Sequence, residues 1–237
     1  MASLYFSTAL QAAAVGSQVV LLGEYAKHAV TVARTRVGER LSIGNGRGLV
    51  VHGTVSSVES GQLTLEVESV RDEPLPSPQL WLVQALAKGD RDELAVQAAT
   101  ELGASGVIPF SASRSVSRWD AAKAEKGRAR WEAIVREASK QSIRAWVPAV
   151  EPVASAAAIG SLESVLVLDP TATVALTEVD LPAAGRIHLV VGPEGGIDEK
   201  EFGVLGGTRV RLGAEVLRTS TAGPAALAVL NARLGRW

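Results

Sequence analysis

The sequence predicts an α/β protein in which a small amino-terminal β domain precedes a larger domain with a mostly parallel sheet. Residues 1–72 are rich in Val, Leu, Thr and Ser and are interrupted by glycine every few residues. Three prolines fall within residues 74–78, and proline disfavours both helix interiors and central strands. Apolar strands then alternate with helices to the end of the chain. We therefore place one domain at residues 1–72 and a second at residues 80–237, joined by a semi-rigid linker.

Turn residues and a period of two predict a small β-barrel or sandwich in the first domain. Asn45-Gly46 separates two apolar segments, residues 40–43 and 49–55, which is a typical β-hairpin signal. Residues 63–70 alternate apolar and polar side chains, as expected of a strand with one buried face. A short helix is expected at residues 27–34.

The second domain is expected to contain five strands and four helices. The strands are predicted at residues 80–86, 107–110, 164–168, 186–191 and 208–212. The helices are predicted from Asp90 to about Gly103, from about residue 120 to 144, and near residues 198–205 and 224–234. Asp90 and Asp198 have capping-box spacing to Glu93 and Glu201, and Pro224 suits a first helical turn. We expect core or interface positions, rather than base stacking, for Trp81, Trp119, Trp131 and Trp146.

Composition excludes several classes of protein. The chain has 24 basic and 25 acidic residues, which argues against a uniformly basic nucleic-acid coat protein. Cysteine is absent and the three histidines lie far apart, so neither disulfides nor a metal site is expected. No apolar run approaches the roughly 20 residues that span a bilayer. Since the first basic residue is Lys27, no secretory signal is expected, and the predicted compartment is the cytoplasm.

The strongest local motif is Val191-Gly-Pro-Glu-Gly-Gly196, directly after an apolar strand. Ligands of open α/β sheets bind outside the carboxyl ends of the strands, where this loop must lie. Pro193 fixes one φ angle, while Gly195 and Gly196 tolerate positive φ and allow a ligand to approach the backbone. The motif is neither a Walker sequence nor GxGxxG, so phosphate binding is not the natural interpretation. A tight turn without a ligand is the alternative.

A second candidate is the long connection Leu212–Pro224, since about 2–6 residues usually suffice between such elements. Its Arg218 could address an anion or a base edge, or could instead form a surface ion pair. A third candidate is the segment 114–144, which holds nine basic and four acidic residues. Such a patch is typical of contact with a phosphate backbone, and a solvated helix face is the alternative.

Taken in order, four segments resemble the RsmE family of bacterial ribosomal RNA methyltransferases, which methylate N3 of a uridine in 16S RNA. They are Lys88–Glu93 with Thr100–Gly103, Ile108–Phe110 with Arg114–Val116, Arg136–Arg144 with Val147-Pro148, and Val191–Gly196 with Leu212–Thr219. The amino-terminal region matches more loosely, through His28, Arg34 and Gly44–Gly48. The resemblance implies a PUA-like RNA-binding β-barrel followed by a SPOUT-type α/β domain that contains a trefoil knot and forms a homodimer.

The resemblance also implies the cofactor and its site. S-adenosylmethionine would be bound by Leu168, Gly192, Pro193, Glu194, Gly195, Gly196, Leu212, Gly213, Val216, Leu217 and Thr219. Small-subunit ribosomal RNA would contact His28, Arg34, Arg114, Arg118, Lys123 and Arg128. Two departures from the family stand out. Ser220 replaces a usual glutamate, and the usual arginine just after Met1 is missing, so the RNA contact expected there is absent or made elsewhere.

The composition is compatible with methyl transfer, because this reaction needs neither a metal nor a cysteine. It needs the nucleophile and the methyl group to be held in line. Uracil N3 becomes nucleophilic as its proton leaves, so the site should stabilise an imide anion. We expect Arg144 or Arg218 to do so, because a guanidinium is permanently charged and planar. The alternatives are a ribose 2′-O-methyltransferase acting on transfer or ribosomal RNA, which Gln141–Arg144 disfavours, and a non-catalytic knotted RNA-binding protein, which the glycine motif disfavours.

Overall fold

The computed structural model describes residues 4–237, and within it the chain divides into two compact units. The first unit comprises the chain up to Leu75 together with Ser139–Val147, and the second comprises Pro76–Ala138 and Pro148–Trp237. The departure noted just after Met1 falls on residues 1–3, outside the described part of the chain. Within the described part, no helix is both long and apolar enough to cross a membrane.

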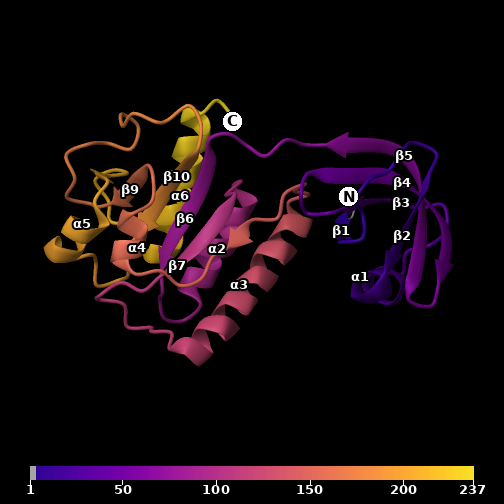
Figure 1. Ribbon diagram of the computed structural model, residues 1–237, viewed down its shortest axis with the longest axis horizontal. Coiled ribbons are helices and arrows are strands. Elements are labelled where there is room, and N and C mark those ends of the chain that lie inside the picture. Colours follow the sequence, from indigo (N-terminus) through magenta and orange to yellow (C-terminus); the bar gives the residue numbers. More distant parts are fainter. Residues whose placement is uncertain (1–3) are drawn as a thin grey trace. The chain divides into compact units, whose positions relative to one another are not determined.

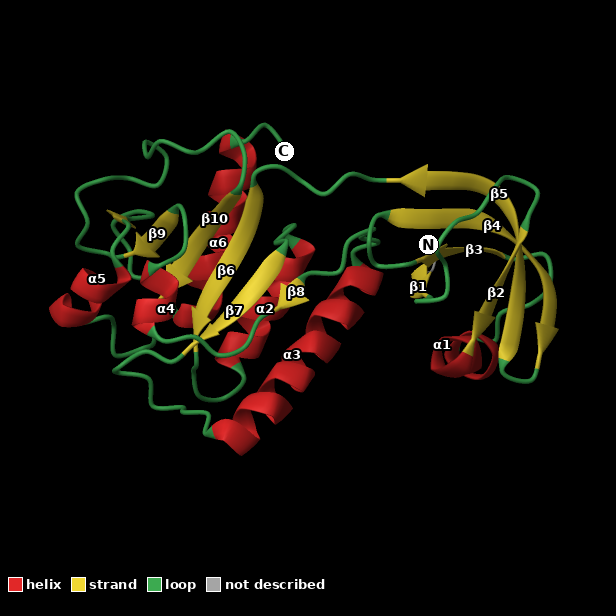
Figure 2. Cartoon of the chain, in the orientation of Figure 1, coloured by secondary structure: helices red, strands yellow, loops and turns green. Residues whose placement is uncertain are grey.

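The first unit is built on one five-stranded sheet (Figures 1 and 2). Its strands are β1 (Leu4–Phe6), β2 (Gln18–Leu22), β3 (Arg40–Gly44), β4 (Leu49–Glu59) and β5 (Gln62–Asp72), in the order β1-β3-β4-β5-β2. β1 is parallel to β3, and the other neighbours are antiparallel. Leu63, Leu65 and Val67 point into the core, which confirms the period of two predicted for this segment.

The hairpin predicted at Asn45-Gly46 is confirmed between β3 and β4. The Asn45 side chain closes the turn, since its Oδ1 accepts from the backbone N–H of Arg47 (2.7 Å) and of Leu49 (3.2 Å). Gly48 has φ +103°, and a Cβ there would lie 2.5 Å from the carbonyl oxygen of Glu73. Only glycine fits this position, because both the backbone angle and the space exclude a side chain.

Residues 139–147 pack with the first unit, whereas the sequence analysis placed them in the domain 80–237. The backbone N–H of Gly48 donates to Ala145 (3.1 Å), and that of Val147 donates to Gly46 (3.1 Å). The Trp146 indole N–H also donates to the carbonyl of Glu73 (2.9 Å). These bonds join segments that are distant in the sequence, and for that reason local patterns did not reveal them.

The helix predicted at residues 27–34 is wrong in its limits. The structure has α1 at Gly23–Lys27, followed by a π-helical segment, η1, at His28–Val32. The chain turns into α1 directly after β2, at Gly23, whose φ is +73°. Ala26 and Ala29 are the residues of these two segments that reach the core.

The second unit contains a six-stranded sheet in which every neighbouring pair is parallel. Its strands are β6 (Gln79–Ala85), β7 (Gly106–Phe110), β8 (Ala149–Val150), β9 (Val165–Leu168), β10 (Arg186–Val191) and β11 (Thr208–Val210), in the order β11-β9-β10-β6-β7-β8. The five predicted strands are confirmed to within two residues at each end. The two-residue strand β8 was missed because it is too short to show a period.

Helices pack on both faces of this sheet (Figure 2). On one face α2 (Arg91–Glu101) contacts α6 (Thr219–Arg233), and both contact the central strands. On the other, α4 (Ala156–Gly160) and α5 (Glu199–Leu205) bury Ile159 and Leu205 against alternate residues of the strands. The long helix α3 (Ala121–Gln141) follows β7. Its spacing predicts one apolar face with Trp131, Ile134, Val135 and Ala138, of which Ile134 is half-buried and the other three are buried.

One predicted helix cap and one predicted helix start need correction. Asp90 does not cap α2: its φ is +58° and its side chain makes no capping bond. Asp92 turns inward instead, where its carboxylate accepts from the backbone N–H of Ala87 (3.1 Å). Helix α6 begins at Thr219 rather than near residue 224, so that Pro224 lies inside it. Asp198, by contrast, does cap α5 by accepting from the Glu201 N–H (2.8 Å).

The start of α6 is fixed by a chain of side-chain hydrogen bonds. The Thr219 hydroxyl donates to the carbonyl of Gly192 (3.0 Å) and accepts from Nε2 of Gln84 (2.8 Å). One turn later, a Cβ on Gly223 would lie 2.8 Å from the Leu82 side chain, so the helix approaches the sheet closely. These contacts hold the carboxyl end of β10, which leads into the glycine motif, against the first turn of α6.

Candidate active site

Three loops at the carboxyl ends of β9, β10 and β11 enclose a cavity of about 560 Å³. They comprise residues 168–170, 191–197 and 210–219, and side chains of α5 and α6 complete the walls. A cavity of this volume, placed at the carboxyl ends of parallel strands, is typical of a small-molecule site in an α/β protein.

The residues predicted to bind the cofactor converge on this cavity. Ten of the eleven line it, namely Leu168, Gly192, Pro193, Glu194, Gly196, Leu212, Gly213, Val216, Leu217 and Thr219. Gly195 does not. The predicted arginine Arg218 lines the cavity as well. Two loops that are about 20 residues apart in the sequence therefore form one site.

Of the two motif glycines expected to have positive φ, Gly196 does and Gly195 does not. Gly196 has φ +71° and has open space where a Cβ would lie, whereas Gly195 has no positive φ. A Cβ on Gly195 would lie 3.2 Å from the Cβ of Arg114, so this glycine allows another loop to pack behind the motif. Gly213 has nothing within 3.5 Å of a Cβ position, so an added side chain there meets no backbone.

The mouth of the cavity is apolar and exposed. Val216 is 75% exposed and Leu217 is 40% exposed, although both are large apolar residues. Phe202 and Ile197 add further apolar surface to the walls. Exposed apolar side chains around a concave site are typical of a surface that a ligand or a partner covers.

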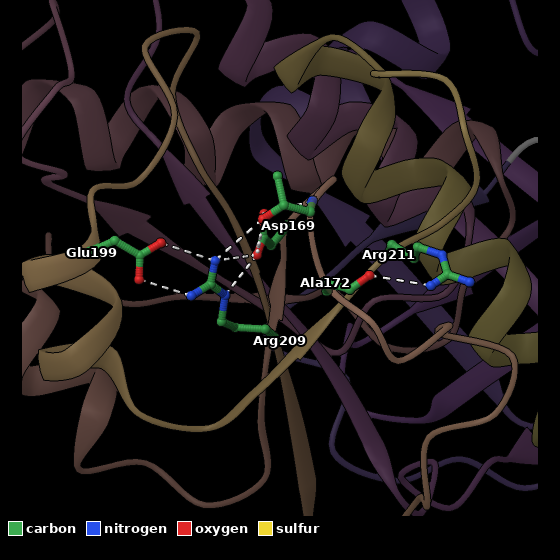
Figure 3. A network of polar contacts seen from close by, with 6 residues as sticks. Asp169, Ala172, Glu199, Arg209 and Arg211 are labelled. Carbon is green, nitrogen blue, oxygen red and sulfur yellow. Dashed lines mark hydrogen bonds and ion pairs between the residues drawn. The ribbon is translucent and has the colours of Figure 1, made fainter.

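Polar groups that the sequence analysis missed support one wall of the cavity (Figure 3). Asp169, which directly follows β9, accepts from Nε of Arg209 (2.6 Å) and from the backbone N–H of Thr171 (2.9 Å). The Arg209 guanidinium also pairs with Glu199 (3.0 Å) and lies 4.0 Å above the ring of Phe202. Arg209 thus joins β9, β11 and α5 behind the Phe202 side chain that lines the cavity.

Burial opposes ionisation of Asp169, but hydrogen bonds from Thr171 and the Arg209 guanidinium outweigh it and hold its pKa below the usual range. A carboxyl group with a lowered folded-state pKa stabilises the fold above its unfolded-state pKa of about 3.9. This stabilisation is lost as the pH falls through the folded-state pKa.

We expect Asp169→Asn to lower the thermal unfolding temperature by roughly 3–6 °C at pH 7, because it removes charge-assisted acceptors from a buried position. The difference should stay constant from pH 8 to about pH 5 and shrink below about pH 4. Calorimetry across this range measures it, with the exposed Asp180→Asn as the matched control. A difference that grew on acidification would contradict this account of Asp169.

The two arginines predicted to stabilise an anion lie in different units. Arg218 lines the cavity in the second unit, and its guanidinium has no hydrogen-bond or ion-pair partner among residues 4–237. Arg144 belongs to the first unit, within the segment 139–147, and is not among the cavity residues. Burial lowers the pKa of Arg144 to about 10, with Glu73 opposing, so that it still carries its charge at neutral pH.

The cavity also contains charged residues that were not predicted. Arg91, at the start of α2, pairs with Glu194 (3.0 Å) and so fixes the carboxylate of the motif. Arg211 donates to the carbonyl groups of Ala172 and Thr173 (3.2 and 2.7 Å), which ties two of the loops together (Figure 3). Glu215 lines the cavity with an exposed carboxylate.

The predicted RNA contacts of the second unit differ in exposure and in their partners: Arg114, Arg118 and Lys123 are exposed, whereas Arg128 is half-buried. Lys123 pairs with Asp120 (3.4 Å) and Arg128 with Glu132 (3.2 Å), whereas Arg114 and Arg118 donate only to carbonyl groups. His28 and Arg34 are exposed in the first unit. In the described part of the chain, no group of three or more His, Asp or Glu side chains could hold a metal ion.

Comparison with known proteins gives consistent matches over both units. Residues 73–231 match the family described as "RNA methyltransferase domain", and residues 21–68 match "RNA methyltransferase PUA domain". The chain is 40% identical over 233 residues to a ribosomal RNA small subunit methyltransferase E of Mycobacterium bovis, covering 94% of this chain and 89% of that protein. The corresponding Bacillus subtilis protein is 33% identical, covering 89% of this chain and 88% of that protein.

A solved structure agrees in fold. The ribosomal RNA small subunit methyltransferase E of Neisseria gonorrhoeae, bound to S-adenosylmethionine, superposes with a TM-score of 0.86 at 28% identity and covers 98% of both chains. The predicted fold class, a PUA-like domain followed by a SPOUT-type α/β domain, is confirmed. The trefoil knot stays a prediction.

Proposed function

Because the chain belongs to the ribosomal RNA small subunit methyltransferase E family, we propose that it methylates N3 of a uridine in 16S ribosomal RNA, with S-adenosylmethionine as the methyl donor. One observation carries the proposal. The motif loops, which are distant in the sequence, converge on a single cavity at the carboxyl ends of the parallel strands.

The cavity fits S-adenosylmethionine in size, shape and charge. Its volume is that of a typical cofactor site, and Gly196 and Gly213 leave the backbone open to a ligand. The apolar side chains of Leu168, Phe202 and Val216 suit an adenine ring, and the Glu215 carboxylate suits a cationic ligand. When bound, the cofactor supplies a methyl group on a positively charged sulfur.

The chain's own residues would then bind and orient the reactants. The loops 191–197 and 210–219, which line the cavity, would hold the donor and limit its contact with water. Arg218 would contact the uracil and stabilise the negative charge that develops as the N3 proton leaves. Asp169 and Glu194 are poor candidates for accepting that proton, because Arg209 and Arg91 already pair with them.

We propose that the loop 111–118 and the start of α3 hold the RNA through its phosphates. Replacing Arg114 and Arg118 together by Gln should lower the slope of log affinity against log salt by roughly 0.7–0.9 for each phosphate that is no longer neutralised. Replacing Lys123 and Arg128 together should have a smaller effect, since both already pair with acidic residues. Filter binding of a 16S transcript at several salt concentrations compares the two variants. Equal slopes in the wild type and both variants would show that this region is a solvated surface that does not contact the RNA phosphates.

We also propose a homodimer, with the outer face of α6 at the interface. The sequence predicts an interface that includes the apolar residues of this helix, namely Leu227, Val229, Leu230 and Leu234. Leu227 and Leu230 are fully buried in their own unit, which leaves the half-buried Val229 and Leu234 for the interface. Val229→Glu should shift a dimer toward monomer, because it places a charge in an apolar contact. Sedimentation velocity at micromolar concentration measures this, with the exposed Ala232→Glu as the control. A wild-type protein that sediments as a monomer would contradict the proposal.

The proposed reaction is tested in two steps. Calorimetry on the purified protein measures binding of S-adenosylmethionine. Ribosomal subunits from a strain that lacks the enzyme are then incubated with protein and donor, and mass spectrometry maps the modified nucleotide. Methyl on uracil N3 supports the proposal. Methyl on a ribose 2′-oxygen favours the alternative transferase, and the absence of donor binding favours a non-catalytic RNA-binding protein.

A further inference from the structure

A buried carboxylate outside the cavity holds one loop in place. Glu201 of α5 is only 8% exposed, and both of its oxygens accept hydrogen bonds from Ser113. Oε1 accepts from the Ser113 backbone N–H (2.7 Å), and Oε2 accepts from its hydroxyl (2.9 Å). The same hydroxyl lies 3.2 Å from Oδ2 of Asp198, the cap of α5. We call this arrangement the Ser113 clamp.

The Ser113 clamp takes the place of the second, reciprocal hydrogen bond of a capping box, whose first bond is made by Asp198. A glutamate at this position of a capping box usually bonds back to the N–H of the capping residue. Glu201 instead reaches Ser113, which is 88 residues away in the sequence. Burying a carboxylate is costly unless it is fully hydrogen-bonded, so this arrangement stabilises one particular position of the loop.

The loop fixed by the Ser113 clamp carries Arg114 and Arg118, two of the arginines proposed to contact RNA. Nη1 of Arg114 donates to the carbonyl of Gly195 (3.2 Å), and Arg118 donates to the carbonyl of Ser113 itself (3.0 Å). Between them Val116 is 63% exposed, which gives the loop an apolar side chain flanked by two cations. Gly195 belongs to the motif whose other residues line the cavity.

We propose that Glu201 and Ser113 are positioning residues for the RNA substrate: they hold the loop that carries Arg114 and Arg118, so that the Arg114 guanidinium stays on the motif loop at Gly195 and the Arg118 guanidinium stays on Ser113. This proposal rests on the proposed function, because the Ser113 clamp would fix how the bound RNA is placed relative to the cofactor cavity. The clamp itself touches neither the cofactor cavity nor, on this account, the RNA.

The test compares RNA binding and cofactor binding in clamp variants. Ser113→Ala removes one charge-assisted hydrogen bond of the clamp and should weaken binding of a 16S transcript about tenfold. Glu201→Ala removes both bonds and should weaken it by at least as much. Both should lower the salt slope toward that of the Arg114→Gln, Arg118→Gln variant. Glu201→Gln should stay within about threefold of wild type, because its amide can accept from the Ser113 N–H and donate to the hydroxyl. Affinity for S-adenosylmethionine should change less than threefold in all of them.

Non-additivity distinguishes positioning from general stability. Adding Glu201→Ala to the Arg114→Gln, Arg118→Gln variant should weaken RNA binding less than twofold further, because the guanidinium groups it positions are already absent. Ser113→Ala provides the same readout if Glu201→Ala fails to fold, and the exposed Glu178→Ala is the matched control. Unchanged affinity and salt slope in Ser113→Ala, or full additivity, would overturn the proposal. These outcomes are independent of the proposed reaction, which is tested on the wild type by donor binding and by the position of the transferred methyl group.

Discussion

Replacing Arg218 by alanine should slow methyl transfer to ribosomal RNA by about 10²–10³-fold under single-turnover conditions with both substrates saturating. Removing one preorganised donor to a developing anion typically costs this much. Arg218 lines the cavity, and its guanidinium has no partner among the described residues. It is therefore free to bind a substrate oxygen.

Comparison with lysine separates charge from geometry. Arg218→Lys should recover only part of the rate, because an ammonium group is a point charge and cannot make two parallel hydrogen bonds to adjacent acceptors. Affinity for S-adenosylmethionine, measured by calorimetry, should change little in either variant. Full activity in Arg218→Lys would show that charge alone suffices.

The same experiment should include Arg144→Ala, because Arg144 is the other arginine that the sequence predicts to stabilise the anion. Arg144 keeps its charge at neutral pH, although burial lowers its pKa to about 10. If Arg144→Ala alone abolishes the rate while Arg218→Ala does not, then the anion is stabilised by the residue from the first unit. If both variants keep rates close to wild type, stabilisation of the anion by arginine is wrong, and backbone or RNA groups must do it.

Local sequence patterns predicted much of this fold, because most of its strands and helices are determined by the residues within and next to them. The five longer strands of the second unit are apolar runs bounded by turn residues, and each is present where expected. The Gly192–Gly196 and Leu212–Leu217 loops follow two of these strands, so the rule for ligands of open sheets placed the cavity correctly.

Tertiary contacts account for what local patterns missed. Asp90 has the sequence of a helix cap, but its side chain makes no capping bond. Asp92 turns inward instead and accepts from the backbone N–H of Ala87. The Asp169–Arg209 pair and the Ser113 clamp both join residues at least 40 positions apart. Single charged residues on separate elements carry no periodic signal, and only the folded chain shows which of them meet.

Gly213→Val should abolish detectable binding of S-adenosylmethionine, weakening it by at least about 100-fold, while the protein stays folded. Gly213 has no positive φ, and a Cβ there meets only the Glu215 side chain, at 3.8 Å. The added methyl groups would therefore enter the cavity without straining the backbone. In wild type, donor at 100 times its Kd should stabilise the fold by about 2.7 kcal/mol, or roughly 5–10 °C in Tm. The variant should show no such shift.

Two further variants decide whether the cavity is the site of donor binding. Ala214→Val places the same side chain at the next residue, which does not line the cavity, and should bind the donor as wild type does. Gly195→Val should press on Arg114 instead, because a Cβ there lies 3.2 Å from that side chain. We therefore expect it to disturb RNA binding more than donor binding. A folded Gly213→Val protein with wild-type donor affinity would place the donor elsewhere and would remove the main support for the proposed function.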